Sequence, residues 1–156
     1  METSRLKKML FEIACATVAC DGKVDEREIR ELEYMDQSTT YFGDIDLSKQ
    51  LALFIENFKM SPENTIANAI GRLKRETLNP VEELLVLEIA LRLVYADVKI
   101  DPKEIQFVNS IRSCLSLDDE MIKQRFGVSE LLFSGKKFEK ESEDKSVGTF
   151  YNNRIE

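Results

Sequence analysis

Two short acidic segments carry the side chains of this chain that could do chemistry. The first reads Asp-Gly-Lys-Val-Asp-Glu-Arg-Glu from Asp21 to Glu28, and the second reads Asp-Val-Lys-Ile-Asp-Pro-Lys-Glu from Asp97 to Glu104. Carboxylate oxygens are the ligands that calcium, magnesium and manganese prefer. The acids that occupy matching positions in the two segments are the candidate ligands of such an ion: Asp21, Asp25, Glu28, Asp97, Asp101 and Glu104.

The absence of histidine from the sequence narrows the chemistry further. Histidine is the commonest protein ligand of transition metals and the commonest general base, so Ser–His and Cys–His catalysis are excluded. No other nucleophile stands in a recognisable catalytic pattern. We therefore expect a protein that is not an enzyme, whose only cofactor would be a divalent cation: Ca²⁺, Mg²⁺ or Mn²⁺.

The first segment resembles only the second half of an EF-hand calcium loop. Asp21 would be the fifth position of that loop, Gly22 the sixth and Glu28 the twelfth, which is the bidentate ligand. The first and third ligand positions would then fall on Thr17 and Ala19. Because calcium takes six to eight oxygens, half a loop cannot hold it alone. We do not expect a true EF-hand.

Helix capping is the structural alternative for the same acids. Asp25 with Glu28, and Asp101 with Glu104, have the spacing of capping boxes, in which the glutamate reaches back to the backbone of the cap residue. The other two candidates, Asp21 and Asp97, follow the carbonyl ends of predicted helices, where a negative charge gains nothing from the helix dipole. Lys23 and Lys99, which lie two residues after Asp21 and Asp97, could neutralise these two charges.

An internal repeat relates the two segments. A shift of 76 residues aligns Asp21 with Asp97, and between residues 13 and 29 it gives eight identities at seventeen positions without a gap. Each copy reads as an apolar helix, an acidic loop and a second helix that begins near the glutamate. The repeat predicts a pseudo-symmetric pair of helix–loop–helix units at about residues 5–76 and 80–133, which would bring the acidic loops to the same side.

The elements that must position these loops read as helices nearly throughout. Leu47, Leu51, Phe54 and Ile55 follow the 3.6-residue period, and a proline follows a capping residue at three further helix starts. We predict an all-α single domain of about seven helices over residues 1–133, with Leu6–Cys20 and Leu84–Ala96 central and nearly antiparallel. Residues 134–156 are polar and of mixed charge, which predicts a flexible tail.

Composition excludes several kinds of partner. A net charge of −7 without a basic stripe argues against nucleic acid. The most apolar stretch, Leu84–Ala96, is too short to span a membrane and contains Glu88 and Arg92. Three cysteines without a CxxC spacing indicate reduced thiols, and the polar start of the chain shows no signal peptide, so we expect a cytoplasmic protein.

The doubled segment Ala19-Cys20-Asp21-Gly22-Lys23-Val24-Asp25-Glu26-Arg27-Glu28 and Ala96–Glu104 resembles the tellurite-resistance TerB-like family, whose loops read Ala-Asp-Gly-x-Ile/Val-Asp-x-x-Glu. The resemblance covers residues 5–133. It implies an all-helical, non-enzymatic bacterial domain of stress response or tellurite resistance, which binds a divalent metal or a protein partner of a stress-response complex through its acidic loops. Val98 departs from this pattern where the first loop has Gly22, so we expect the second loop to differ in shape from the first. The alternative function is a scaffolding domain whose acids only cap helices.

Overall fold

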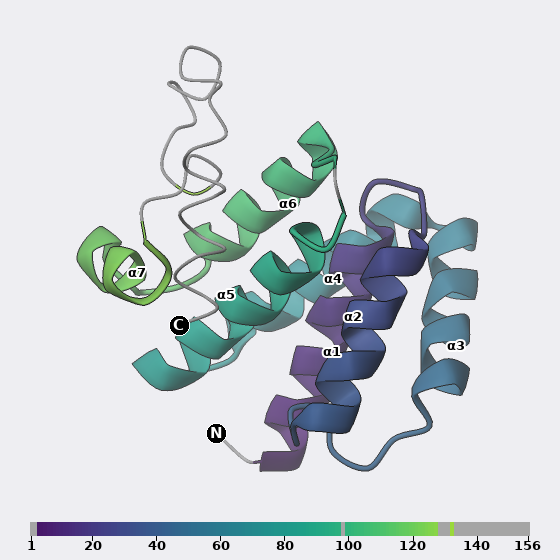
Figure 1. Cartoon of the computed structure of the whole chain (residues 1–156), viewed down its shortest axis with the longest axis horizontal. Coiled ribbons are helices and arrows are strands. Elements are labelled where there is room, and N and C mark those ends of the chain that lie inside the picture. Colours follow the sequence, from purple (N-terminus) through teal and green to yellow (C-terminus); the bar gives the residue numbers. More distant parts are fainter. Residues whose placement is uncertain (1–2, 98, 128–131, 133–156) are drawn as a thin grey trace.

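The computed structural model describes residues 3–97, 99–127 and 132, and in this part of the chain it contains seven α-helices and no strand (Figure 1). The prediction of an all-α fold of about seven helices is confirmed. Residues 134–156, for which we predict a flexible tail, lie outside the described residues. The helices are α1 (Thr3–Ala19), α2 (Glu26–Ser38), α3 (Leu47–Met60), α4 (Pro62–Arg75), α5 (Pro80–Val94), α6 (Pro102–Ser113) and α7 (Asp119–Phe126).

Local signals set the helix starts. Proline occupies the first turn of α4, α5 and α6, where its missing N–H costs no hydrogen bond. Asn79 caps α5 by accepting a hydrogen bond from the backbone N–H of Glu82 at 2.8 Å, and the Glu82 carboxylate accepts one from the Asn79 N–H at 2.9 Å. These paired bonds satisfy donors that the helix itself leaves free.

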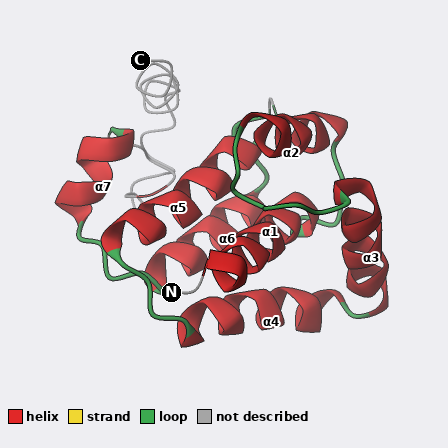
Figure 2. Cartoon of the chain, turned by 90° about the horizontal axis from the view of Figure 1, so that it is seen from below, coloured by secondary structure: helices red, strands yellow, loops and turns green. Residues whose placement is uncertain are grey.

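Helices α1 and α5 form the centre of the fold. Every residue of α1 from Ile13 to Ala19 is buried, and most of α5 from Val86 to Val94 is buried as well. A helix that is apolar on all sides must be covered on all sides. Figure 2 shows how this is done: α2 and α4 lie on opposite sides of the central helices, while α3 and α7 lie at opposite edges.

The two central helices run in the same general direction, so the antiparallel arrangement predicted from the sequence is wrong. The loops that follow α1 and α5 touch, because Arg27 at the start of α2 pairs with Asp97 at a distance of 3.1 Å. The carboxyl ends of α1 and α5 therefore lie together, and both helices rise toward these loops in Figure 1. The amino ends of α2 and α6 therefore also lie close together, at the same end of the molecule.

The structure also bears on the predicted absence of a membrane span. Among the described residues, none of the helices is both long enough and apolar enough to cross a bilayer.

Candidate functional site

All six predicted acids belong to the two loops that meet at this end of the molecule, or to the first turns of the helices that follow. Asp25 is the N-cap residue of α2, and Asp101 is the N-cap residue of α6. Glu28 and Glu104 are the third residues of those two helices. The structure therefore brings together residues that are far apart in the sequence, as expected for a site shared by both loops.

Glu28 and Glu104 form the interior of this site. Each is only 1% exposed, and the two carboxyl groups lie close enough to shift each other's pKa. Burial, then the neighbouring carboxyl group of Glu104 and its negative charge, raise the pKa of Glu28 to about 10. Burial also raises the pKa of Glu104, although the carboxyl group of Glu28 and the backbone N–H of Asp101 act in the opposite direction. The pair therefore retains one proton at neutral pH.

The two glutamates differ in their backbone contacts. Glu104 completes a capping box, because one of its oxygens accepts a hydrogen bond from the backbone N–H of Asp101 at 2.9 Å. The capping box predicted for Asp25 and Glu28 is wrong. Asp25 does cap α2, by accepting a hydrogen bond from the Arg27 N–H at 2.7 Å. Within the described residues, however, neither oxygen of Glu28 has a donor from the backbone or from a basic side chain.

Asp21 and Asp97 have a local role that the sequence did not reveal. Each closes a turn by accepting a hydrogen bond from the backbone N–H two residues later, at 2.9 Å for Asp21 and 3.5 Å for Asp97. Short Asp side chains commonly stabilise turns in this way. The pKa of Asp21 is nevertheless raised, first by burial, with a further contribution from the charge of Asp101. These two acids thus shape the loops and add negative charge beside the buried pair.

The positive charge that joins the loops comes from Arg27. Lys23 and Lys99 were the predicted neutralising groups, yet among the described residues neither side chain forms an ion pair. Arg27 is paired with Asp97 instead, and its guanidinium group is more than half exposed. Sequence reasoning missed Arg27 because it lies among mixed charges with no distinctive spacing.

Gly22 gives the first loop its shape. Its φ angle is +82°, a conformation that costs an ordinary residue about 1–2 kcal/mol but is open to glycine. The corresponding residue of the second loop, Val98, lies outside the described residues. The expected difference in shape between the two loops therefore stays a prediction.

The arrangement has clear chemical limits. In the described part of the chain, no group of three or more cysteine, aspartate or glutamate side chains is already arranged to hold a metal ion. What the loops do provide is a pair of buried, opposed carboxyl groups with unsatisfied oxygens, surrounded by four further aspartates. Such oxygens can hold a proton or accept a cation.

The capping role of Asp101 leads to a testable expectation. Asp101→Ala should lower the free energy of unfolding by about 1 kcal/mol, because α6 loses the acceptor for the Lys103 N–H and half of its capping box. Chemical denaturation in metal-free buffer measures this loss. Ser61→Ala is the matched control, because Ser61 occupies the N-cap position of α4 without a side-chain capping bond. An equal loss in both variants would show that the Asp101 carboxylate contributes nothing as a cap.

These features define an all-α domain in which two acidic helix–loop–helix junctions meet over a buried pair of glutamates. The chain belongs to the tellurite resistance protein TerB family: the model of that family matches residues 8–125, which include both loops. Searches of curated proteins and of solved structures returned no match.

Proposed function

We propose that this tellurite-resistance-related domain acts by binding, not by catalysis, and that its acidic loops hold one divalent cation. Glu28 and Glu104 would be the central ligands. The observation that carries the proposal is the burial of Glu28 with both carboxylate oxygens lacking a donor from the backbone or from a basic side chain. A buried carboxyl group without such partners is costly, and a cation would offset that cost.

The chemistry of the donors fits a hard cation. All candidate ligands are carboxylates, and the sequence offers no histidine for zinc or copper. Magnesium often binds through only one or two carboxylates and keeps several waters. Two glutamates could therefore serve Mg²⁺ or Mn²⁺, whereas Ca²⁺ would need added oxygens from Asp21 or other nearby aspartates. The ion would supply positive charge that locks the two loops together.

The remaining acids would support the ion indirectly. Asp25 and Asp101 each use one oxygen to cap a helix, which fixes the turn that carries the glutamate. Asp97 is held by Arg27, and this ion pair ties the first loop to the second. Carboxylates fixed by such contacts would hold the ligands of the ion in position even without contacting the ion themselves.

Isothermal titration of the chelator-treated protein with Mg²⁺, Mn²⁺ and Ca²⁺ tests the proposal. We expect saturable binding of one ion per chain by at least one of the three. Glu28→Gln/Glu104→Gln should abolish the binding, because an amide keeps the shape of the side chain but not its charge. The variant should still fold, since it removes a buried pair of acids.

The matched control is Glu33→Gln/Glu56→Gln, which neutralises two exposed glutamates outside the loops and should bind as the wild type does. Absence of binding by all three ions at millimolar concentration would contradict the proposal, and so would unchanged binding in the Glu28/Glu104 variant. The scaffolding alternative would then stand, since Asp25 and Asp101 already act as caps.

A further inference from the structure

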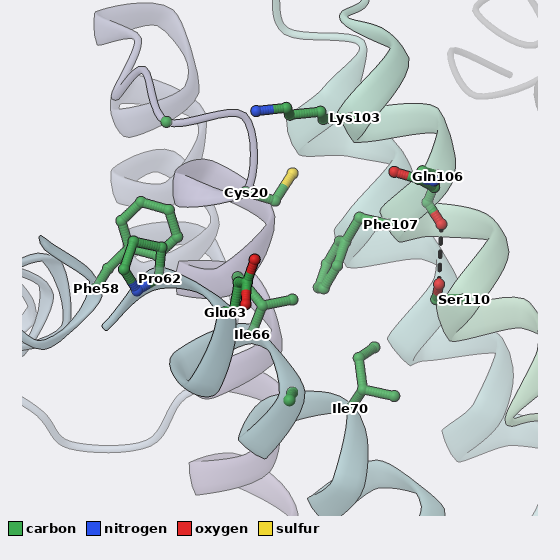
Figure 3. Close-up of a pocket in the computed structure, with 12 residues that line it drawn as sticks. Cys20, Phe58, Pro62, Glu63, Ile66, Ile70, Lys103, Gln106, Phe107 and Ser110 are labelled. Carbon is green, nitrogen blue, oxygen red and sulfur yellow. Dashed lines mark hydrogen bonds between the residues drawn. The ribbon is translucent and has the colours of Figure 1, made fainter. Parts of the chain in front are cut away.

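A groove of about 740 Å³ lies between α4 and α6, lined by apolar side chains that include Ile66, Ile70 and Phe107 (Figure 3). Its charged lining residues are Glu63 and Lys103, whose charges offset each other. The groove therefore has no net charge that would favour an anionic or a cationic occupant. A second, smaller hollow differs in this respect.

The second hollow has a volume of about 510 Å³ and lies where α1, α3 and the loop between α2 and α3 meet. Aromatic rings form its floor, because Phe42 is only 2% exposed and Phe11 and Phe54 are half-buried. The rings of Phe11 and Phe42 pack edge to face, with their centres 5.6 Å apart. Leu53 lines the hollow from α3 and is 47% exposed. A hollow of this size with an aromatic lining is typical of sites for small organic molecules.

The charged residues of this second hollow leave one positive charge without an opposing one. They are Lys8, Glu12 and Arg72. Arg72 pairs with Glu12 at 3.4 Å, so these two charges offset each other. Lys8 is exposed, and among the described residues its ammonium group forms no ion pair. The hollow therefore favours an anion over a cation.

Two side-chain amides add hydrogen-bond donors to the same hollow. Gln50 and Asn57 line it from α3, and their separation of seven residues places them on one face of that helix. Within the described part of the chain, neither amide group makes a side-chain hydrogen bond. Each amide has two N–H donors, which suit the oxygens of a carboxylate. The hollow thus combines an aromatic floor with a cation and neutral donors.

We propose that this hollow binds a small aromatic carboxylate. The ring of the ligand packs against Phe11 and Phe54, since aromatic rings attract one another beyond the area that they bury. Its carboxylate faces Lys8. The apolar contact supplies most of the affinity, and the charge selects an anion over a neutral molecule of the same shape. No residue of the acidic loops lines the hollow, so the proposal does not depend on the cation site.

Fluorescence titration of the full chain with naphthoate tests the proposal. The chain contains no tryptophan, so the emission of the naphthalene ring can be followed without tryptophan background. We expect saturable binding of one molecule per chain. Naphthalenemethanol has the same rings without the charge, and we expect it to bind about fivefold more weakly.

Three variants locate the two parts of the site. Lys8→Met should weaken naphthoate binding about fivefold and leave the affinity for naphthalenemethanol unchanged, which a purely structural effect would not do. Phe54→Leu should weaken the binding of both molecules about threefold, because it removes an aromatic contact and keeps an apolar side chain. Lys59→Met is the matched control, an exposed lysine of α3 that does not line the hollow, and should bind as the wild type does. Circular dichroism would verify that all three variants fold.

Several results would overturn the proposal. They are the absence of saturable naphthoate binding at millimolar concentration, equal affinity of the wild type for naphthoate and naphthalenemethanol, and undiminished naphthoate binding by Lys8→Met. A loss in Lys59→Met as large as that in Lys8→Met would also overturn it, because the preference for an anion would then come from the general charge of the surface.

Discussion

Raising the pH from 5 to 7 should destabilise the metal-free protein by about 2 kcal/mol and lower its unfolding midpoint by roughly 4–8 °C. The cause is Glu28, whose pKa is about 10 in the folded protein and near 4.5 when unfolded. Below pH 4.5 the folded and the unfolded protein both carry the Glu28 proton, so titration of this group does not change the free energy of unfolding. Above pH 4.5 the unfolded protein loses the proton while the folded protein keeps it. Stability therefore falls as pH rises, until the folded pair also ionises near pH 10.

The composition of the chain makes the effect of Glu28 easy to isolate between pH 5 and 8. No histidine is present, so no side chain with an ordinary pKa between 5 and 8 competes with the glutamate pair. Glu28→Gln should remove most of the slope, because glutamine supplies a neutral hydrogen-bond donor at every pH. At pH 8 this variant should be more stable than the wild type, which is uncommon for a change at a buried position.

Thermal unfolding followed by circular dichroism, in the presence of a chelator, measures both effects. Glu33→Gln serves as the control, because Glu33 is exposed on the same helix, α2, and should leave the slope unchanged. A wild-type midpoint that stays constant from pH 5 to 8 would contradict the shared proton. A slope that persists in Glu28→Gln would place its origin elsewhere.

A second large effect is expected at Arg92, which connects α5 to α2. Its side chain is 10% exposed and pairs with Glu31 at 2.8 Å and with Glu88 at 3.7 Å. Arg92→Met should keep most of the packing volume but leave Glu31 half-buried without a cation. Breaking such a pair from one side is strongly destabilising, so we expect a loss of about 2–3 kcal/mol in the free energy of unfolding. The midpoint should fall by roughly 5–10 °C.

Equilibrium denaturation of three variants separates this effect from simple loss of a surface charge. Arg30→Met is the control, since Arg30 and its partner Glu26 are both mostly exposed and should contribute little. The double variant Arg92→Met/Glu31→Gln should recover part of the lost stability, because no unpaired charge remains. A loss for Arg92→Met as small as that for Arg30→Met would show that the pair behaves as a surface contact.

The helices themselves were predictable because their signals are local. Apolar spacing fixed the buried face of each segment, and prolines after Ser61, Asn79 and Asp101 marked three helix starts that the structure confirms. Gly43 lies in the loop between α2 and α3, and its φ of +74° shows why a glycine stands there. None of these features depends on a contact with a distant part of the chain.

The candidate site was predictable as a list of acids but not as an arrangement. Matching positions suggested equal roles for Glu28 and Glu104, yet only Glu104 reaches the backbone of its cap residue, while Glu28 turns toward the other carboxyl group. Helical periodicity gives the face on which a side chain lies, but it cannot give the neighbour that the face meets.

That neighbour was decided by the packing of α1 on α5, in the same direction and not antiparallel. This packing places Arg27 beside Asp97, and it buries Glu28 next to Glu104. Their shared proton follows from burial and proximity between segments far apart in the chain, and both are properties of the tertiary structure alone.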